Sequence, residues 1–329
     1  MNPDLPDRIF KINSRTDFHN IALEIFRYQA ATNKIYNSFI KNLGIDPDTV
    51  VQAEDIPFLP VSFFRTHKVI SGIHTGNLVF ESSGTSGKMT SRHFVADGGL
   101  YEKSFLRTFR LFYGDPADYM IAALLPSYTE RANSSLVYMV DRLIKESGCP
   151  SSGFYRENTN EMLSYIYSAR REEKKVLLIG VSYALLDLSE KNSPDLSDVI
   201  VMETGGMKGR RKEMIREELH SVLKKKLNVD RIHSEYGMTE LLSQAYSKGD
   251  GLFFCPPWMK ILIRDPLDPL SILQDYGKTG GINIIDLANI NSCSFIATDD
   301  LGKLHPDNSF EVMGRFDSSD IRGCNLLLE

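Results

Sequence analysis

The 329-residue sequence predicts an α/β fold with mostly parallel sheets flanked by helices, followed by a β-rich C-terminal subdomain. Two observations lead to this prediction. Between residues 98 and 226, apolar runs typical of buried strands alternate with stretches of helical periodicity, and repeated strand–helix units imply parallel strands with crossover helices. After residue 250 the helical period fades and short β-rich segments follow, which indicates an antiparallel sheet or partial barrel.

Three segments follow from this change of pattern. Residues 1–55 are expected to form an N-terminal helical segment packed on the core, residues 56–250 an α/β core, and residues 251–329 the β-rich subdomain. The sequence contains no low-complexity linker and no internal repeat, so one compact arrangement is the simplest expectation.

The helices and strands are predicted in chain order from the spacing of apolar residues and from the positions of glycine and proline. Apolar residues recur at helical spacing over residues 17–43, which predicts one long amphipathic helix ending at Gly44. Residues 56–64 combine prolines with aromatic residues, so this segment is expected to run across the surface of a core without regular helix, or to help line an acyl pocket. Further helices are predicted at 98–113, 134–147, 160–173, 182–191 and 209–226, and strands at 78–80, 93–95, 120–125, 176–180, 199–202, 230–233, 259–263, 281–286, 293–298, 302–304 and 309–313.

Composition excludes several classes of protein. A hydrophobic fraction of 42% with 25% charged residues is typical of a soluble globular protein. A net charge of -5 does not favour binding to nucleic acid, which is itself negatively charged. We expect no secretory signal and no membrane span, because neither pattern occurs. Cys149, Cys255, Cys293 and Cys324 form no Cys-x-x-Cys pair, which argues against a zinc site or a disulfide framework and favours a cytoplasmic protein with reduced thiols.

A loop rich in glycine and hydroxyl groups lies between the two predicted strands 78–80 and 93–95. Its glycines allow backbone N–H groups to turn inward, its hydroxyls donate hydrogen bonds and its lysine adds a positive charge, which together suit a triphosphate. A surface hairpin is the alternative. A Walker-type loop is excluded, because Ser82 occupies its first glycine position and Met89 follows the lysine. The candidate residues are Ser83, Gly84, Thr85, Ser86, Gly87 and Lys88.

Two further motifs follow predicted strands. In the motif that ends Tyr236-Gly237-Met238-Thr239-Glu240, tyrosine suits stacking on a base, glycine permits close approach, threonine suits a phosphate and glutamate suits a hard cation. The alternative is a strand-to-helix turn capped by Thr239 and Glu240. Near the end, Asp299-Asp300 and Arg315 suit ribose hydroxyls and phosphate, or form only a turn.

In this fixed order, these motifs, together with Gly205-Gly206-Met207 and Gly314-Arg315-Phe316-Asp317, resemble the signature of the adenylate-forming superfamily of acyl- and aryl-CoA ligases. The resemblance covers most of the chain from about residue 56. Within this superfamily, the chain looks most like the acyl-protein synthetase (LuxE-type) branch, because of residues 59–64, residues 125–128 and its short length. Phenylacetate-CoA ligases are the next most similar group.

The resemblance implies ATP and Mg²⁺ as cofactors and gives each motif a role. It places ATP phosphates on Ser83, Gly84, Thr85, Gly87 and Lys88, adenine against Gly205, Gly206 and Tyr236, the α-phosphate on Thr239, Mg²⁺ on Glu240, and ribose on Asp300 and Arg315. Met89 replaces a usual proline, and Asp299 stands where glycine is usual, which leaves it as a rival to Asp300.

The sequence stops at Glu329, where the full-length ligases continue into a further domain carrying a catalytic lysine. A built-in thiol would accept the acyl group in its place. Cys324 lies where LuxE-type synthetases carry the acceptor cysteine, and Arg322 would favour its thiolate, although a small buried hydrophobe is the alternative. Cys255 and Cys293 are weaker candidates, as are His233, Tyr128 and Arg131 for contacts to substrate.

The sequence therefore predicts ATP-dependent activation of a carboxylic acid, plausibly a fatty acid, to acyl-AMP with release of pyrophosphate, then acyl transfer to a thiol. A CoA or carrier-protein ligase with a separate lid domain, and a silent nucleotide-binding protein, remain alternatives. An acyl-acceptor protein is a possible partner, and the use of CoA stays open.

Overall fold

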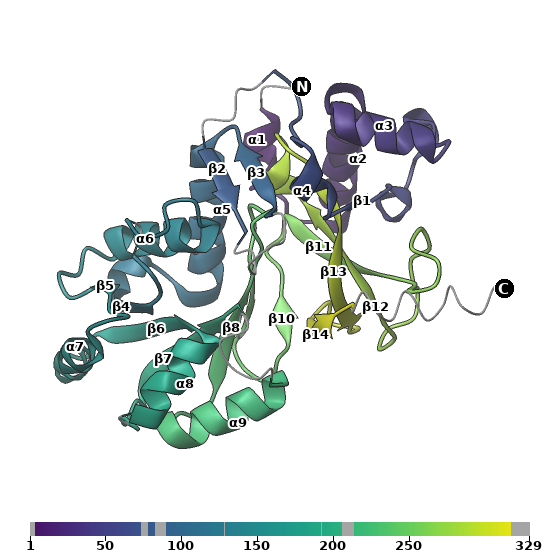
Figure 1. Ribbon diagram of the computed structural model, residues 1–329. Coiled ribbons are helices and arrows are strands. Elements are labelled where there is room, and N and C mark those ends of the chain that lie inside the picture. Colours follow the sequence, from purple (N-terminus) through teal and green to yellow (C-terminus); the bar gives the residue numbers. More distant parts are fainter. Residues whose placement is uncertain are drawn as a thin grey trace. The chain divides into compact units, whose positions relative to one another are not determined.

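The computed structural model of the chain describes residues 4–73, 78–82, 90–127, 129–191, 193–205 and 214–316. The chain divides into two units, which we name by their place in the sequence. The inserted unit comprises Asn77–Pro256, and the split unit comprises Met1–Gly76 with Pro257–Glu329, so that the inserted unit interrupts the sequence of the split unit (Figure 1).

The inserted unit is built on a largely parallel sheet. Strands β5, β4, β6, β7 and β8 are parallel neighbours in this order, and β9 and β10 continue the sheet antiparallel. The predicted mostly parallel arrangement is thereby confirmed. The strands are β4 (Tyr119–Leu124), β5 (Gly153–Phe154), β6 (Lys175–Val181), β7 (Val199–Thr204), β8 (Ile232–Tyr236), β9 (Ala245–Ser247) and β10 (Phe253–Phe254).

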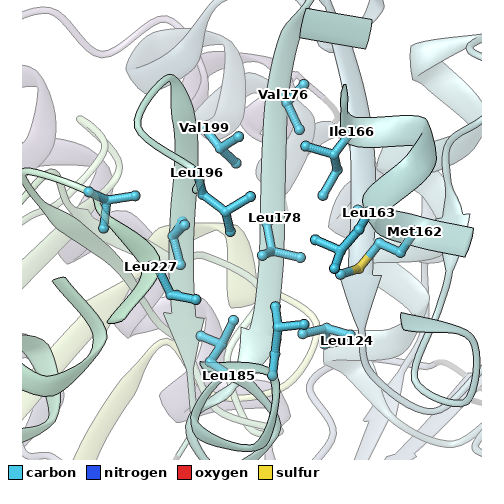
Figure 2. Packing of buried hydrophobic residues seen from close by; sticks show 14 of the residues in the cluster. Leu124, Met162, Leu163, Ile166, Val176, Leu178, Leu185, Leu196, Val199 and Leu227 are labelled. Atoms are coloured by element: carbon cyan, nitrogen blue, oxygen red, sulfur yellow. The ribbon is translucent and has the colours of Figure 1, made fainter. Parts of the chain in front are cut away.

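Helices cover both faces of this sheet because its central strands are apolar on both sides. Val176 and Leu178 of β6 point into a cluster shared with the three helices α7, α8 and α9 (Figure 2). On the other face, Phe109 of α5 makes an edge contact with Tyr119 of β4, and α6 also packs on β4. Each fully buried leucine contributes about 1.5–3 kcal/mol. The helices are α5 (Gly98–Tyr113), α6 (Ser135–Ser147), α7 (Thr159–Arg171), α8 (Ser182–Lys191) and α9 (Arg216–Leu227).

A short antiparallel hairpin formed by β2 (Leu78–Glu81) and β3 (Arg92–Val95) carries the glycine-rich loop between its strands. Phe80 anchors it: the side chain is fully buried and lies against Tyr101 of α5 and Tyr138 of α6, with ring centroids 5.3 and 5.6 Å away. The strands that hold the loop are therefore fixed on the helical layer of the inserted unit.

The split unit contains an antiparallel sheet, as predicted for the segment after residue 250. Its strands follow the order β11, β12, β13, β14, and β1 pairs in parallel with the first part of β13. The predicted strands 293–298 and 302–304 form a single strand, β13. The elements are β1 (Leu59–Pro60), β11 (Met259–Arg264), β12 (Thr279–Asp286), β13 (Phe295–Leu304), β14 (Phe310–Arg315), α1 (Leu5–Ile9), α2 (Arg15–Thr32), α3 (Lys34–Asn42) and α4 (Phe63–Thr66).

The single helix expected over residues 17–43 is wrong, because the chain breaks at Asn33. The Asn33 side chain caps α3 by accepting hydrogen bonds from the N–H groups of Ile35 and Tyr36. Its amide nitrogen donates to Ser71 Oγ and Ser292 O, so tertiary partners hold the break. The helix α4, directly after β1, likewise corrects the expectation that residues 56–64 contain no helix.

Long-range polar contacts join the two sequence segments of the split unit. Gln29 of α2 is fully buried, and its amide nitrogen donates to Asn289 O and Ile290 O at 3.1 and 2.9 Å. Its amide oxygen accepts from Ser294 N at 2.9 Å. The N-terminal helices are thus part of the same unit as the β-rich segment. Within the described ranges, no helix is long and apolar enough to cross a membrane.

Candidate functional site

The carboxyl ends of β6, β7 and β8 lie side by side in the inserted unit, because these strands are parallel neighbours. Gly180 pairs with Glu203, and Glu203 pairs with Ser234, which brings the three strand ends to one edge. Ligands of open α/β sheets bind at this edge. Gly205, directly after β7, and Tyr236, at the end of β8, both lie at this edge.

Glu203 is a buried carboxylate with basic partners. Arg216 Nε donates to its Oε1 at 3.4 Å, and His220 Nε2 lies 3.6 Å from the same oxygen. Burial alone would raise the pKa of the Glu203 carboxyl, but the contacts from His220 and Arg216 outweigh burial and hold that pKa below its ordinary value. Glu203 is therefore ionised at neutral pH and fixes α9 against the end of β7.

Glu235, on the neighbouring strand β8, has a different environment. Its Oε2 accepts a hydrogen bond from Thr204 Oγ1 at 2.6 Å, and no basic side chain in the described part of the chain pairs with it. Burial raises the pKa of the Glu235 carboxyl to about 7; the Thr204 hydrogen bond opposes this shift and the charge of Glu203 adds to it. Near neutral pH, Glu235 is therefore partly protonated.

Gly237 follows β8 and is exposed. A Cβ at this position would collide with Glu235 Oε1 and lie 3.4 Å from Gln244 Cγ, so the Glu235 carboxyl would have to move to admit a side chain. Gln244 is only 4% exposed, and its amide oxygen has no hydrogen-bond partner in the described structure. Leaving a buried acceptor unpaired costs about 1–3 kcal/mol. Such a group calls for a donor from a ligand or water.

Gly205 turns the chain at the end of β7. Its φ of 65° lies in the left-handed region, which favours glycine. Ser182 Oγ, at the start of α8, donates to Gly205 O at 2.7 Å and lies 3.3 Å from Glu203 Oε2. The predicted adenine-binding backbone is thus held by a side chain from the next strand end, whereas Gly206 lies outside the described residues.

Tyr236 is 8% exposed and packs edge-on against Phe253, with ring centroids 5.9 Å apart. The Arg216 guanidinium lies 4.9 Å from the centroid of the Phe253 ring. Arg216 therefore links the Glu203 carboxylate to the aromatic pair. Stacking of Tyr236 on a base stays a prediction.

The base of the glycine-rich loop lies beside the Tyr-Gly-Met-Thr-Glu motif. Ser82 N donates to Ser91 O at 3.0 Å and Ser82 Oγ accepts from Ser91 N at 2.9 Å, which closes the two ends of the loop. The fully buried His93, on the exit strand β3, bonds through Nδ1 to Thr239 O at 2.8 Å. Two motifs far apart in sequence thus meet. Ser83, Gly84, Thr85, Ser86, Gly87 and Lys88 lie outside the described residues.

Thr239 and Glu240 sit in a turn closed by Leu241 N donating to Met238 O. The antiparallel strand β9 follows this turn, so the alternative of a helix capped by these two residues is wrong. Glu240 is 6% exposed and supplies the hard oxygen ligand that suits Mg²⁺. Among the described residues, no group of three or more His, Cys, Asp and Glu side chains is arranged to hold a metal ion. Mg²⁺ is commonly held by one or two carboxylates together with substrate phosphates, and the Glu240 carboxylate fits this mode of binding.

In the split unit, the two neighbouring aspartates have separate partners. Asp300 is 6% exposed and accepts from Arg315 Nε at 3.1 Å, across the β13–β14 pair. Asp299 is about half exposed and pairs with Arg65 at 3.2 Å. The structure thus joins the predicted pair Asp300 and Arg315.

The weaker candidates are placed as follows. His233 bonds through Nδ1 to Tyr113 OH at 3.1 Å, and burial lowers the pKa of its imidazole to about 4, so it is neutral at pH 7. Arg131 is exposed in a surface turn, with its N–H donating to Ser127 O. Tyr128 lies outside the described residues.

The described thiols differ in burial. Cys293 is fully buried, and burial raises the pKa of its thiol to about 12, which leaves little thiolate at neutral pH. Cys149 and Cys255 are partly buried. Cys324, the predicted acyl acceptor, lies outside the described residues.

Sequence reasoning did not identify Arg216, His220, Gln244, or His93 as site residues. The only available signal was that Glu203 and Glu235 end apolar or alternating strands, where a charge is unusual. Glu203 contacts Arg216 and His220 of the later helix α9, whereas Glu235 accepts a hydrogen bond from Thr204 of the preceding strand β7. No sequence spacing reveals these contacts.

No protein-family model matches the sequence, and no curated protein matches it. Solved structures match its fold. MatB from Rhodopseudomonas palustris, crystallised with ATP, is 14% identical over 74% of this chain and 49% of that chain, with a TM-score of 0.54. A long-chain-fatty-acid-CoA ligase, FadD1 from Archaeoglobus fulgidus, is 14% identical over 76% of this chain and 53% of that one, with a TM-score of 0.54.

A third structure is the O-succinylbenzoate coenzyme A synthetase MenE from Bacillus subtilis in complex with ATP and magnesium ion. It is 16% identical over 74% of this chain and 51% of that chain, with a TM-score of 0.50. The chain thus spans about half the length of these three structures. At these identities the likeness establishes the fold, and the predicted fold class is confirmed.

Proposed function

We propose that this protein is an ATP-dependent enzyme that activates a carboxylic acid as acyl-AMP, releases pyrophosphate and then passes the acyl group to a thiol. One observation carries the proposal. The hydrogen bond from His93 to Thr239 O brings the base of the glycine-rich loop onto the Tyr-Gly-Met-Thr-Glu motif, in a chain with the fold of MatB, FadD1 and MenE.

In the first step, a carboxylate oxygen of the acid attacks the α-phosphorus, and the bond from that phosphorus to the pyrophosphate oxygen breaks. Backbone N–H groups and hydroxyls of residues 83–87 hold the phosphates, Lys88 supplies a positive charge, and Thr239 donates to the α-phosphate. No protein base is needed, because a carboxylic acid is ionised at neutral pH. Glu240 would hold Mg²⁺, which when bound supplies positive charge against the transferring phosphate oxygens.

We assign the adenine and the ribose of ATP to different motifs of the sequence. Gly205, Gly206 and Tyr236 contact adenine, Gly237 permits close approach of the nucleotide, and Asp300 with Arg315 binds ribose. The buried Asp300, which accepts a hydrogen bond from the exposed Arg315, supports this choice over the exposed Asp299.

In the second step, a thiolate attacks the acyl carbon, a thioester forms and AMP leaves. The resemblance to LuxE-type acyl-protein synthetases favours Cys324 as this thiol and a fatty acid as the substrate. An acceptor protein, a carrier or CoA would then take the acyl group. A cytoplasmic location would keep the thiol reduced.

Exchange of labelled pyrophosphate into ATP tests the first step. We expect exchange that depends on both acid and Mg²⁺, and a loss of about 10²-fold in Glu240→Gln. The exposed Glu157→Gln serves as the control and is expected to leave the rate unchanged. Absence of exchange over a broad panel of acids would refute the proposal.

The second step is tested by trapping the labelled thioester. Cys324→Ala is expected to lose the protein-bound label while pyrophosphate exchange continues, and Cys149→Ala is expected to keep both. A label that survives in Cys324→Ala would assign the thiol to another group.

The two aspartates provide a matched pair for the nucleoside. Asp300→Asn is expected to raise the Kd for ATP at least tenfold, whereas Asp299→Asn leaves it nearly unchanged. Equal effects of the two substitutions would contradict the assignment.

A further inference from the structure

Two polar side chains flank one exposed backbone position at the end of β8. Glu235 Oε1 occupies the space where a side chain of Gly237 would begin, and Gln244 Cγ lies 3.4 Å from the same point. Gly237 is itself exposed, so a ligand can approach this position from solvent. The proposed α-phosphate residue, Thr239, is two residues away, which limits the separation of the two Cα atoms to about 7.6 Å.

Both side chains offer acceptors that the described protein does not satisfy. Gln244 Oε1 is shielded from solvent and has no hydrogen-bond partner in the described structure. Glu235 receives one hydrogen bond, from Thr204 on Oε2, and no described donor reaches its Oε1. Buried polar groups are nearly always paired, so the unpaired Gln244 Oε1 indicates a missing donor group, and Glu235 Oε1 offers a second, partly exposed acceptor beside it.

The charge around Glu235 indicates what kind of donor is missing. Glu203, one strand away, has Arg216 and His220 beside it, whereas Glu235 has only a hydroxyl group and lies within the field of the Glu203 charge. A protonated amine would supply both the positive charge and several N–H donors. A plain alkyl chain would supply neither, and would leave Gln244 Oε1 buried without a partner.

We propose that Glu235 and Gln244 recognise an amino group on the acid that this protein activates, so that its substrate is an amino-bearing carboxylic acid. This inference rests on the proposed acid activation and names its substrate class. Because Gly237 and Thr239 are close, the amino group and the reacting carboxylate are separated by only a few bonds.

Pyrophosphate exchange with matched acids tests the proposal. The probes are alanine against propanoate, and 4-aminobutanoate against butanoate. For the wild-type protein we expect at least tenfold higher kcat/KM with the better of the amino acids than with its alkyl counterpart. Gln244→Leu and the nearly isosteric Glu235→Gln should each reduce this preference at least tenfold. Both variants should leave kcat/KM for the alkyl acids and the KM for ATP within about twofold, and Glu157→Gln is the matched control.

The outcomes separate the two proposals. Exchange with alkyl acids but no preference for amino acids overturns this inference and leaves the proposed function standing. Absence of exchange with every acid refutes the proposed function, and this inference with it. A purine amine is the other possible donor, so ATP is compared with ITP, which lacks the amine. If the variants change the preference for ATP over ITP instead of the preference between acids, the donor is adenine and the assignment to the acid is wrong.

If Gln244→Leu fails to fold, Glu235→Gln alone tests the proposal. The additional measurement is the rise in Tm that alanine and ATP each cause in the wild-type protein and in Glu235→Gln. Glu235→Gln is expected to lose the rise in Tm with alanine and keep the rise with ATP. Equal loss of both would indicate a structural role only and overturn the inference.

Discussion

The carboxyl ends of β7 and β8 carry glutamates on adjacent parallel strands in contrasting surroundings. Glu203 has Arg216 and His220 beside it, and these contacts hold the pKa of its carboxyl below the ordinary value. Glu235 has a hydroxyl partner and a pKa raised to about 7. The same residue type at neighbouring strand ends therefore behaves in two ways: the Glu203 carboxylate is paired with basic side chains, whereas the Glu235 carboxyl has no basic partner among the described residues.

The largest expected effect comes from removing the paired charge. Glu203→Leu leaves the Arg216 guanidinium without its carboxylate, and the free energy of unfolding should fall by about 3 kcal/mol. Urea unfolding at pH 7 measures the change. A loss below about 1 kcal/mol would mean that solvent already screens this pair and would weaken the contrast between the two strand ends.

Replacing Glu235 should have the opposite effect on stability above neutral pH: the variant should gain stability relative to wild type. Because the folded-state pKa of Glu235 exceeds its unfolded value, its stabilising contribution is complete below the unfolded pKa and is lost as pH rises through about 7. Glutamine cannot ionise. Between pH 5 and pH 8, the stability of Glu235→Gln relative to wild type should therefore rise by about 2 kcal/mol, allowing for partial exposure. Urea unfolding across this range measures it, and a flat difference would contradict the raised pKa.

A methyl group on Gly237 tests how closely the Glu235 carboxyl approaches the backbone. Gly237→Ala should cost about 1 kcal/mol, because the new Cβ meets Glu235 Oε1 and the side chain must move. In a Glu235→Ala background the cost should vanish. A double-mutant cycle measures the coupling, and additive effects would place the carboxyl elsewhere.

The smallest expected effect separates the charge of Arg216 from its shape. Arg216→Lys keeps the charge beside Glu203 but loses the planar group over the Phe253 ring, at a cost of about 0.5–1 kcal/mol. A loss as large as that of Glu203→Leu would show that geometry, and not charge, holds α9 to β7.

Local signals made part of the fold predictable. Helix α5 has the predicted bounds because its ends are marked in the sequence: Asp97 accepts from the N–H groups of Gly99 and Leu100, and Gly114 follows with a φ of 89°. The break at Asn33 was missed because apolar periodicity continues through it. Its cause lies in Ser71 and Ser292, which are distant in sequence.

For the candidate site, the sequence predicted residue types but not the contacts between them. Residue types with an evident chemistry, such as Tyr236, Thr239 and Glu240, could be proposed as site residues from their order, and their roles stay predictions. The contrast between Glu203 and Glu235 was not, because it depends on which strand end α9 and the turn after β8 approach. Burial and charge compensation arise only when these segments come together.

The hydrogen bonds of Gln29 have a consequence for the newly made chain. Its partner Asn289 lies 260 residues later, while every residue of the inserted unit is already made by Pro256. At about 5–20 residues per second, α2 leaves the ribosome on the order of tens of seconds before its partners exist. During synthesis the inserted unit can fold first, and the N-terminal helices must wait exposed until the last strands arrive, which makes this interval a natural point for a chaperone to act.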